Sequence, residues 1–139
     1  MIRPVTIVLA LLAVPALAAP PTKCLPREIR AAVFVMTQRW GPPEIVSTFR
    51  RNAVIAGTRH RSYHASCRAL DFHPPRGRYR EVLAWLRSTW PGGLGTYSGA
   101  MHHIHIDTGR FVRFHTYVGR AIAAKKRRLA TRAFQPREK

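Results

Sequence analysis

Clusters of proline and glycine interrupt the middle of the chain at short intervals and limit the length of every regular element. They are Gly41-Pro42-Pro43, Pro74-Pro75 and Pro91-Gly92-Gly93. Proline lacks the backbone N–H that helices and inner strands use, and glycine loses more conformational entropy than other residues when it is ordered. The chain therefore has to fold from short helices and strands, and its 139 residues suggest one domain.

Two segments between these breaks carry apolar residues at helical spacing. The first helix is predicted over residues 26–40 and stops at Gly41. The second is predicted over residues 76–90 and stops at the "PGG" that follows. Their inward-facing residues are expected to be Ile29, Val33, Met36 and Trp40 in the first helix, and Tyr79, Val82, Leu83, Leu86 and Trp90 in the second.

The other segments are short and rich in β-branched and aromatic residues. They predict strands at 44–49, 68–72, 94–98, 102–108 and 110–118, with a turn at Ser98-Gly99 and a loop over most of residues 50–67. Helices and strands in this order indicate an α+β domain, spanning residues 24–119, in which two helices flank a largely antiparallel sheet.

The N-terminus has the composition of a secretory signal peptide over residues 1–18. Arg3 provides a positive start, residues 5–14 form an apolar run, and Ala16-Leu17-Ala18 fits a cleavage site. A retained membrane anchor is the alternative, although Pro15 leaves the run short for a transmembrane helix. We expect an exported protein of the periplasm or cell envelope.

Export changes the interpretation of the two cysteines, Cys24 and Cys67. Their number is even and both lie after the signal peptide, so in an oxidising compartment we expect a disulfide between them. Two buried free thiols are the alternative. With two cysteines and no CxxC motif, a thiolate zinc site is not expected.

The formal net charge of +18 favours anionic partners. Residues 120–139 alone hold eight Lys or Arg and one Glu, and we expect this basic tail to be mobile or bound to a surface. For an exported chain, a cell-wall polymer or an anionic membrane is the expected partner. Specific nucleic-acid binding requires a motif as well as charge, and the sequence contains none.

Two histidine-containing segments carry the ligand types of a zinc site. His64 and Asp71 stand at opposite ends of "HASCRALD", where a loop leads into a strand and both side chains can converge on one ion. In "HIHID", His103, His105 and Asp107 share one face of a strand because side chains alternate. Catalytic zinc uses three such ligands and leaves one position open. Alternatively, the first two form a hydrogen-bonded loop pair and the second cluster is a solvated edge.

These segments also carry a family resemblance. "SYHASCRALD" resembles the S-x-H-x-x-G-x-A-x-D signature of the D-alanyl-D-alanine carboxypeptidase and sonic-hedgehog group of zinc peptidases. "GGLGTYSGAMHHIHIDTGR" is similar to a segment of that group's bacterial murein-endopeptidase-like branch, once catalogued as a domain of unknown function, and "VSTFR" to its S-x-x-R strand. The resemblance covers about residues 25–115 and implies amide hydrolysis with one zinc ion per chain.

The resemblance implies that His64, Asp71 and His105 are the zinc ligands. In one departure from the family, Cys67 stands where glycine is usual. A local disulfide with Cys24 would explain the cysteine. If position 67 requires a backbone angle that only glycine adopts readily, the loop that carries His64 differs from that of the family.

A general base must lie within hydrogen-bonding reach of the attacking water. Many members of the group use a glutamate shortly before the last histidine, but this chain has Gly99-Ala100-Met101 there. His103 is the best remaining candidate, as in relatives whose HxH supplies an imidazole; the alternative is that His103 only supports its neighbours. Arg50, at the end of "STFR", suits a substrate carboxylate or the oxyanion of the intermediate, a surface arginine being the alternative.

Three further residues have supporting roles in this interpretation. Asp107 either orients His105 or caps the end of its strand. Tyr97 either donates to the substrate or packs, and Ser62 orders the loop before His64.

The first functional hypothesis is a zinc peptidase that cuts peptidoglycan stem peptides or their cross-links, as a carboxypeptidase or an endopeptidase, at D,D or L,D bonds. The second is a wall-peptide-binding protein that keeps the fold but lacks a competent base. The third is a cationic surface-active protein whose tail provides most of the binding.

Overall fold

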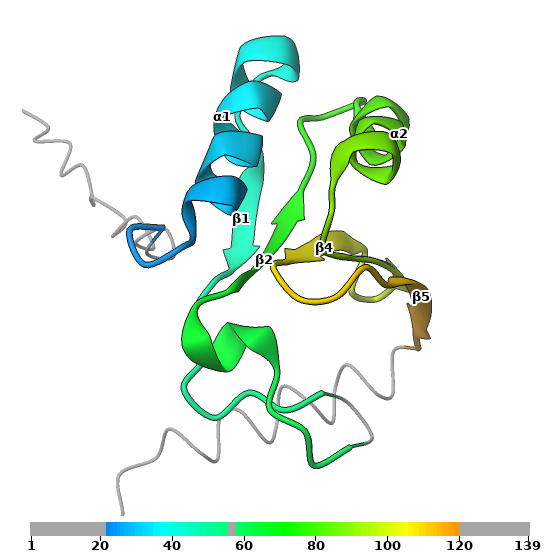
Figure 1. Ribbon diagram of the computed structural model, residues 1–139. Helices are drawn as coiled ribbons and strands as arrows, with labels where there is room; N and C mark the ends of the chain where they lie inside the picture. The colour runs from blue at the N-terminus through cyan, green and yellow to red at the C-terminus, as the bar shows by residue number, and fades with distance from the viewer. Residues whose placement is uncertain (1–21, 56–57, 120–139) are drawn as a thin grey trace, which may run out of the picture.

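The computed structural model describes residues 22–55 and 58–119, which form two α-helices, five strands and one short 3-10 helix (Figure 1). The predicted signal peptide at 1–18 and the predicted tail at 120–139 lie outside these residues. Among the described helices, none combines the length and the apolar character needed to cross a bilayer.

The two helices match the sequence-based expectation closely. Helix α1 spans Arg27–Trp40 and buries Ile29 and Met36 completely. It ends at Gly41, whose φ of 103° is accessible to glycine at little cost. Helix α2 spans Tyr79–Thr89, starting later than predicted, and is followed by the buried Trp90.

The five strands form one mixed sheet in the order β1-β2-β4-β3-β5. The strands are β1 (Glu44–Ser47), β2 (Ala69–His73), β3 (Gly93–Gly99), β4 (His103–Asp107) and β5 (Arg113–Val118). Three pairings are antiparallel, and β5 joins β3 in parallel. The α+β class and the antiparallel-leaning sheet are therefore confirmed.

Several strand boundaries differ from prediction, most by one residue, and β5 begins at Arg113 rather than at residue 110. The first strand ends at Ser47 rather than at residue 49, after a register irregularity opposite β2. The turn predicted at Ser98-Gly99 is wrong, because β3 continues to Gly99, which pairs with Val118 of β5. The chain reverses instead at Ala100 and Met101.

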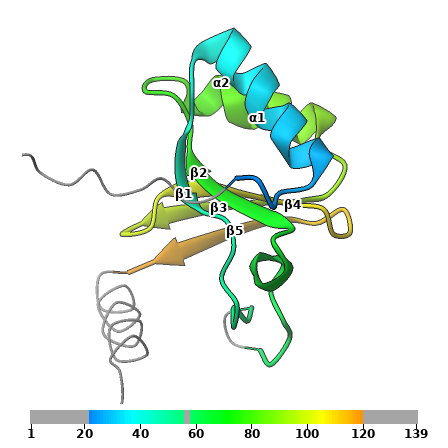
Figure 2. The same ribbon diagram turned by 90° about the vertical axis from the view of Figure 1, so that its left-hand side faces the viewer.

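Both helices cover the same face of the sheet, and the loop from β1 to β2 lies on the opposite side (Figure 2). The core fills the space between helices and sheet, where α1 and α2 pack on Leu70, Phe72, Ile104 and Ile106. Side chains of β4 alternate, so His103, His105 and Asp107 point to the face opposite α1 and α2. This face carries no α-helix and is called the helix-free face below. The sheet thus uses one face for the core and leaves the other for the polar residues.

The predicted disulfide is confirmed. Cys24, just before α1, is bonded to Cys67 across 43 positions of sequence. Cys67 ends the 3-10 helix η1 (Tyr63–Ser66) with φ 55° and ψ 33°, in the left-handed region. The disulfide therefore ties the turn that carries His64 to the start of the first helix.

Candidate metal centre

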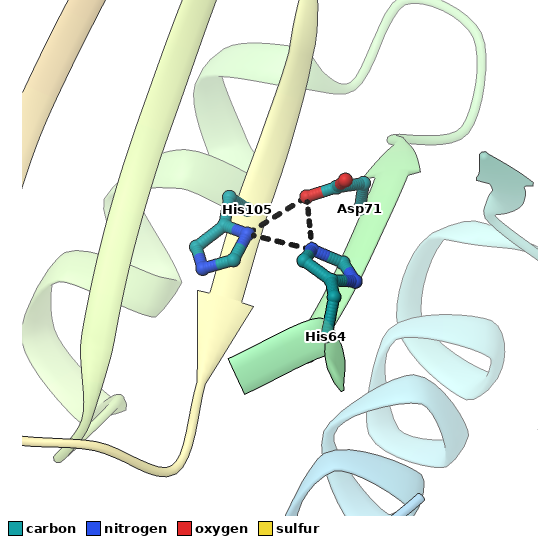
Figure 3. A group of neighbouring side chains, drawn as sticks. All are labelled: His64, Asp71 and His105. Carbon is teal, nitrogen blue, oxygen red and sulfur yellow. Dashed lines mark hydrogen bonds and ion pairs between the residues drawn. The ribbon is translucent and has the colours of Figure 1, made fainter. Parts of the chain in front are cut away.

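Three side chains from different elements converge on the helix-free face of the sheet. Asp71 of β2 and His105 of β4 are directly opposed in the sheet register, and His64 approaches from η1 (Figure 3). His105 Nδ1 lies 2.7 Å from Asp71 Oδ1, and His64 Nε2 lies 3.1 Å from the same oxygen and 3.3 Å from His105 Nδ1. All three residues are buried.

Local hydrogen bonds determine where His64 lies. The Ser62 hydroxyl accepts from the His64 backbone N–H and caps η1, the loop-ordering role expected for it. The backbone N–H of Arg50 donates to the His64 carbonyl, so the turn is attached to the segment after β1. With Cys67 bonded to Cys24, the turn is held at both ends.

Both histidines present the nitrogen that a metal ion would need. His64 Nδ1 donates to the carbonyl of Thr48 at 2.5 Å, so Nε2 is the nitrogen turned toward Asp71 and His105. His105 Nε2 contacts Asp107 Oδ2 at 3.0 Å, so Nδ1 is the nitrogen turned toward Asp71 and His64. Such outer contacts fix the tautomer and the ring orientation of metal-binding histidines.

The charges in the cluster stabilise one another in the absence of a metal ion. Burial raises the pKa of Asp71, but hydrogen bonds from His105 and His64 outweigh it and hold that pKa well below its ordinary value. Burial lowers the pKa of His105, but its bonds to Asp107 and Asp71 outweigh it and raise that pKa to about 9. A divalent cation would take the place of the proton on His105.

The donor set fits zinc. Ligand atoms about 2.0–2.1 Å from a tetrahedral zinc ion lie about 3.3 Å from one another. The three donor atoms are separated by 2.7, 3.1 and 3.3 Å, so small displacements bring them to this spacing. Two imidazole nitrogens and one carboxylate oxygen leave the fourth position free, as catalytic zinc sites do. Among the described residues, this is the group of histidine and carboxylate side chains arranged to hold a metal.

Comparison with protein families agrees with this donor set. A family model described as Peptidase M15 matches residues 18–107, which include all three donors. The chain belongs to the Peptidase M15 family. These are zinc peptidases that include D-Ala-D-Ala carboxypeptidase-like enzymes. Neither the curated proteins nor the solved structures contain a match to the chain.

His103 lies beside the donor triangle of this M15 chain. Its Nε2 is 3.8 Å from Asp71 Oδ1, and its ring stacks on Tyr97 with centroids 4.4 Å apart. Burial lowers the pKa of His103, although the charge of Asp71 and a hydrogen bond to the backbone of Met101 oppose the effect. The ring is therefore neutral at neutral pH and able to accept a proton. His102, just before β4, is exposed and packs against Tyr79 of α2, away from the donors.

Two charged residues lie next to the M15 donor set, Arg50 beside Asp71 and Asp107 beside His105. Arg50 Nη2 lies 3.6 Å from Asp71 Oδ2, and half of its side chain is exposed. Asp107 makes the contacts of both roles considered for it, since Oδ2 contacts His105 and Oδ1 accepts from the Gly109 backbone N–H. Asp107 thus orients a donor and closes the end of β4.

Two features of the site were not found by sequence reasoning. The carbonyl of Thr48 anchors His64, and a backbone group leaves no signature in residue type. Gly93 is required because a Cβ there would lie 2.3 Å from Asp107 Oδ2. The sequence pattern places Gly93 only in the break that ends the second helix, whereas Gly93 also makes room for the Asp107 carboxylate that orients His105.

Proposed function

We propose that this protein is a zinc-dependent peptidase that hydrolyses peptide bonds in peptidoglycan stem peptides or their cross-links. The observation that carries the proposal is the close approach of His64 Nε2, Asp71 Oδ1 and His105 Nδ1 on a sheet face without helices, in a chain of the M15 family. Zinc bound there would polarise a scissile carbonyl and lower the pKa of water toward neutrality.

The residues around the donors divide the remaining work. His103 is placed to accept the proton of the attacking water, since its ring is neutral and lies next to Asp71. Stacking on Tyr97 keeps the imidazole plane in one orientation. After attack, the same imidazole is the group available to return the proton to the leaving amine.

Arg50 is the positive group available for the negative charge that develops during hydrolysis. Its guanidinium is half exposed and within 3.6 Å of Asp71, so it reaches the site without being buried in it. A planar guanidinium can hold the oxyanion or a substrate carboxylate through two N–H groups. Binding the oxyanion is compatible with an endopeptidase as well as a carboxypeptidase. Binding a substrate carboxylate favours a substrate with a free C-terminus, as a carboxypeptidase requires.

A wall-peptide-binding protein on the same fold is the second candidate. Gly99-Ala100-Met101 stand where many relatives of the resembled group have their glutamate base, so catalysis depends on His103. If His103 does not accept the proton, the domain would bind peptides through zinc and Arg50 without cutting them.

The cellular setting is part of the proposal. The signal-peptide composition of residues 1–18 supports export to the periplasm or cell envelope. The net charge of +18 supports contact with an anionic wall or membrane surface, to which the eight basic residues of 120–139 would contribute.

The test is to measure bound zinc in the purified protein and to follow muropeptides released from purified peptidoglycan. We expect one zinc per chain and new muropeptides, whose masses identify the bond that is cut. His64→Ala should lose both the zinc and the products. His103→Ala should retain zinc and lose turnover, whereas the matched His102→Ala, at an exposed histidine just before β4 that packs on Tyr79, should retain both.

Each other outcome has a defined meaning. Zinc without products from the unmodified protein would contradict the peptidase and support the binding protein. Absence of zinc in a preparation exposed to zinc would contradict both. If deleting residues 120–139 abolishes activity while His105→Ala does not, the tail and not the metal site carries the function.

A further inference from the structure

A glycine and a phenylalanine continue the row of site residues across the sheet. On the helix-free face, Asp71, His105, Gly95 and Phe114 oppose one another on β2, β4, β3 and β5. A Cβ added at Gly95 would lie 2.1 Å from Cζ of Phe114. The Phe114 ring therefore fills the space above Gly95 and leans toward His105, with the two ring centroids 5.9 Å apart.

Phe114 forms an aromatic wall with Tyr97 beside the metal centre. The two rings meet edge to face with centroids 5.9 Å apart, and Tyr97 in turn stacks on His103. Phe114 keeps 36% of its surface exposed although it is apolar. Arg50 lies on the opposite flank, next to Asp71. The site is thus apolar toward β5 and cationic toward β1.

We propose that Phe114 is a specificity-determining residue, whose ring forms a shallow apolar subsite for a small aliphatic side chain, such as an alanyl methyl group, adjacent to the scissile bond. This inference rests on the proposed peptidase function. Phe114 lies on β5, beyond residues 18–107, so the family match itself assigns it no role.

The geometry sets both the polarity and the size of the preferred side chain. An anionic side chain placed against the two rings would lose hydration without gaining a partner. The Phe114 ring already fills the space over Gly95, so the subsite has little depth. A longer aliphatic side chain would need that space, and removing the ring would provide it.

The experiment compares synthetic peptides that differ only in the residue next to the cleaved bond, with alanyl, leucyl or glutamyl at that position. For the zinc-loaded full chain we expect alanyl to be preferred. Phe114→Ala should lower the alanyl-to-leucyl ratio of kcat/KM by about tenfold or more, with the loss for alanyl mainly in KM. Phe114→Tyr should restore the preference.

Phe111→Ala is the matched control, since Phe111 is an exposed phenylalanine whose ring contacts Arg113 rather than the site. It should leave the ratio unchanged. Zinc content should be unchanged in both alanine variants, and Phe114→Ala should melt at a lower temperature because the ring no longer packs on Tyr97. An equal loss for alanyl and leucyl, or an unchanged ratio, in Phe114→Ala would overturn the inference.

If the unmodified protein cuts none of the peptides, the proposed function fails separately. The inference is then tested by titrating the zinc-loaded protein with the same peptides. A binding preference for alanyl over leucyl that is lost in Phe114→Ala would support the subsite, and equal affinities in the unmodified protein would overturn it.

Discussion

At the scale of single residues, the proton on His105 is the group with which a metal ion must compete. Without a metal, the ring lies between Asp71 and Asp107, and its pKa is raised to about 9. A metal ligand has to be deprotonated, so binding displaces this proton at neutral pH. The carboxylates of Asp71 and Asp107, which orient His105 for metal binding, thus also stabilise the proton on its ring.

We therefore expect zinc binding to release a proton from His105 and the apparent affinity to rise with pH until about pH 9, the pKa of the metal-free ring. Calorimetry in buffers of different ionisation enthalpy measures the proton released. Asp107→Asn removes one of the charges that raise the pKa of His105, so the apparent zinc affinity should begin to rise, and reach its plateau, at a lower pH. An affinity independent of pH between 7 and 9 would contradict this expectation.

Residue types and spacing predicted the two segments that carry the donors, because His and Asp carry their chemistry in the side chain, and the family resemblance selected His64, Asp71 and His105 among them. His64 and Asp71 were identified as a pair, and His103, His105 and Asp107 as members of one strand face. The nitrogen that each histidine presents was not predictable. That choice depends on the Thr48 carbonyl for His64, and for His105 on which ring nitrogen turns toward Asp107, two residues further along β4.

At the scale of elements, the disulfide is the connection between the helical layer and the turn that carries His64. It closes a loop of 43 positions, which is worth about 4 kcal/mol in the chain-entropy model. Cys67 at φ 55° opposes this gain, because a left-handed residue other than glycine costs about 1–2 kcal/mol. The disulfide therefore outweighs the conformational cost of the cysteine.

We expect Cys24→Ser to lower the free energy of unfolding by several kcal/mol, about 4 in the chain-entropy model. The double variant Cys24→Ser/Cys67→Gly should recover about 1 kcal/mol, because glycine adopts the left-handed angle freely. Denaturant unfolding of the two variants and the unmodified protein provides the comparison. A double variant less stable than Cys24→Ser would show that packing of the buried Cys67 side chain outweighs the cost of its left-handed angle.

The elements themselves were largely predictable, since the apolar spacing of α1 and α2 and the alternation of β4 are local. The position of β5 was not. Its parallel pairing with β3 depends on the path of residues 108–112 and on contacts such as Arg113 with the carbonyls of Trp90 and Gly92. Phe114 could not be placed beside His105 without that pairing.

At the scale of the whole molecule, metal binding and folding are coupled. The three donors come from η1, β2 and β4, so an unfolded chain does not present them together. A ligand that binds only the folded state adds about 2.7 kcal/mol at a free concentration one hundred times its dissociation constant. A metal ion bound by these donors would thus stabilise the sheet and the turn at once.

We accordingly expect zinc to raise the melting temperature by about 10 °C or more under those conditions, because 1 kcal/mol shifts a domain of this size by about 4–8 °C. Thermal unfolding with zinc and with a chelator measures the shift. His64→Ala should remove the shift, whereas His60→Ala, at an exposed histidine of the same loop, should retain it. A shift of equal size in His64→Ala would place the stabilising zinc elsewhere.

The alternation in β4 has a consequence for how the gene can change. Ile104 and Ile106 support the core, and His103, His105 and Asp107 form the site, within five consecutive codons. Substitutions on one set leave the other in place. Insertion or deletion of a single codon before the strand would exchange the two sets between faces. Lineages of this gene should therefore accumulate point changes in β4 but conserve the length of the turn that precedes it.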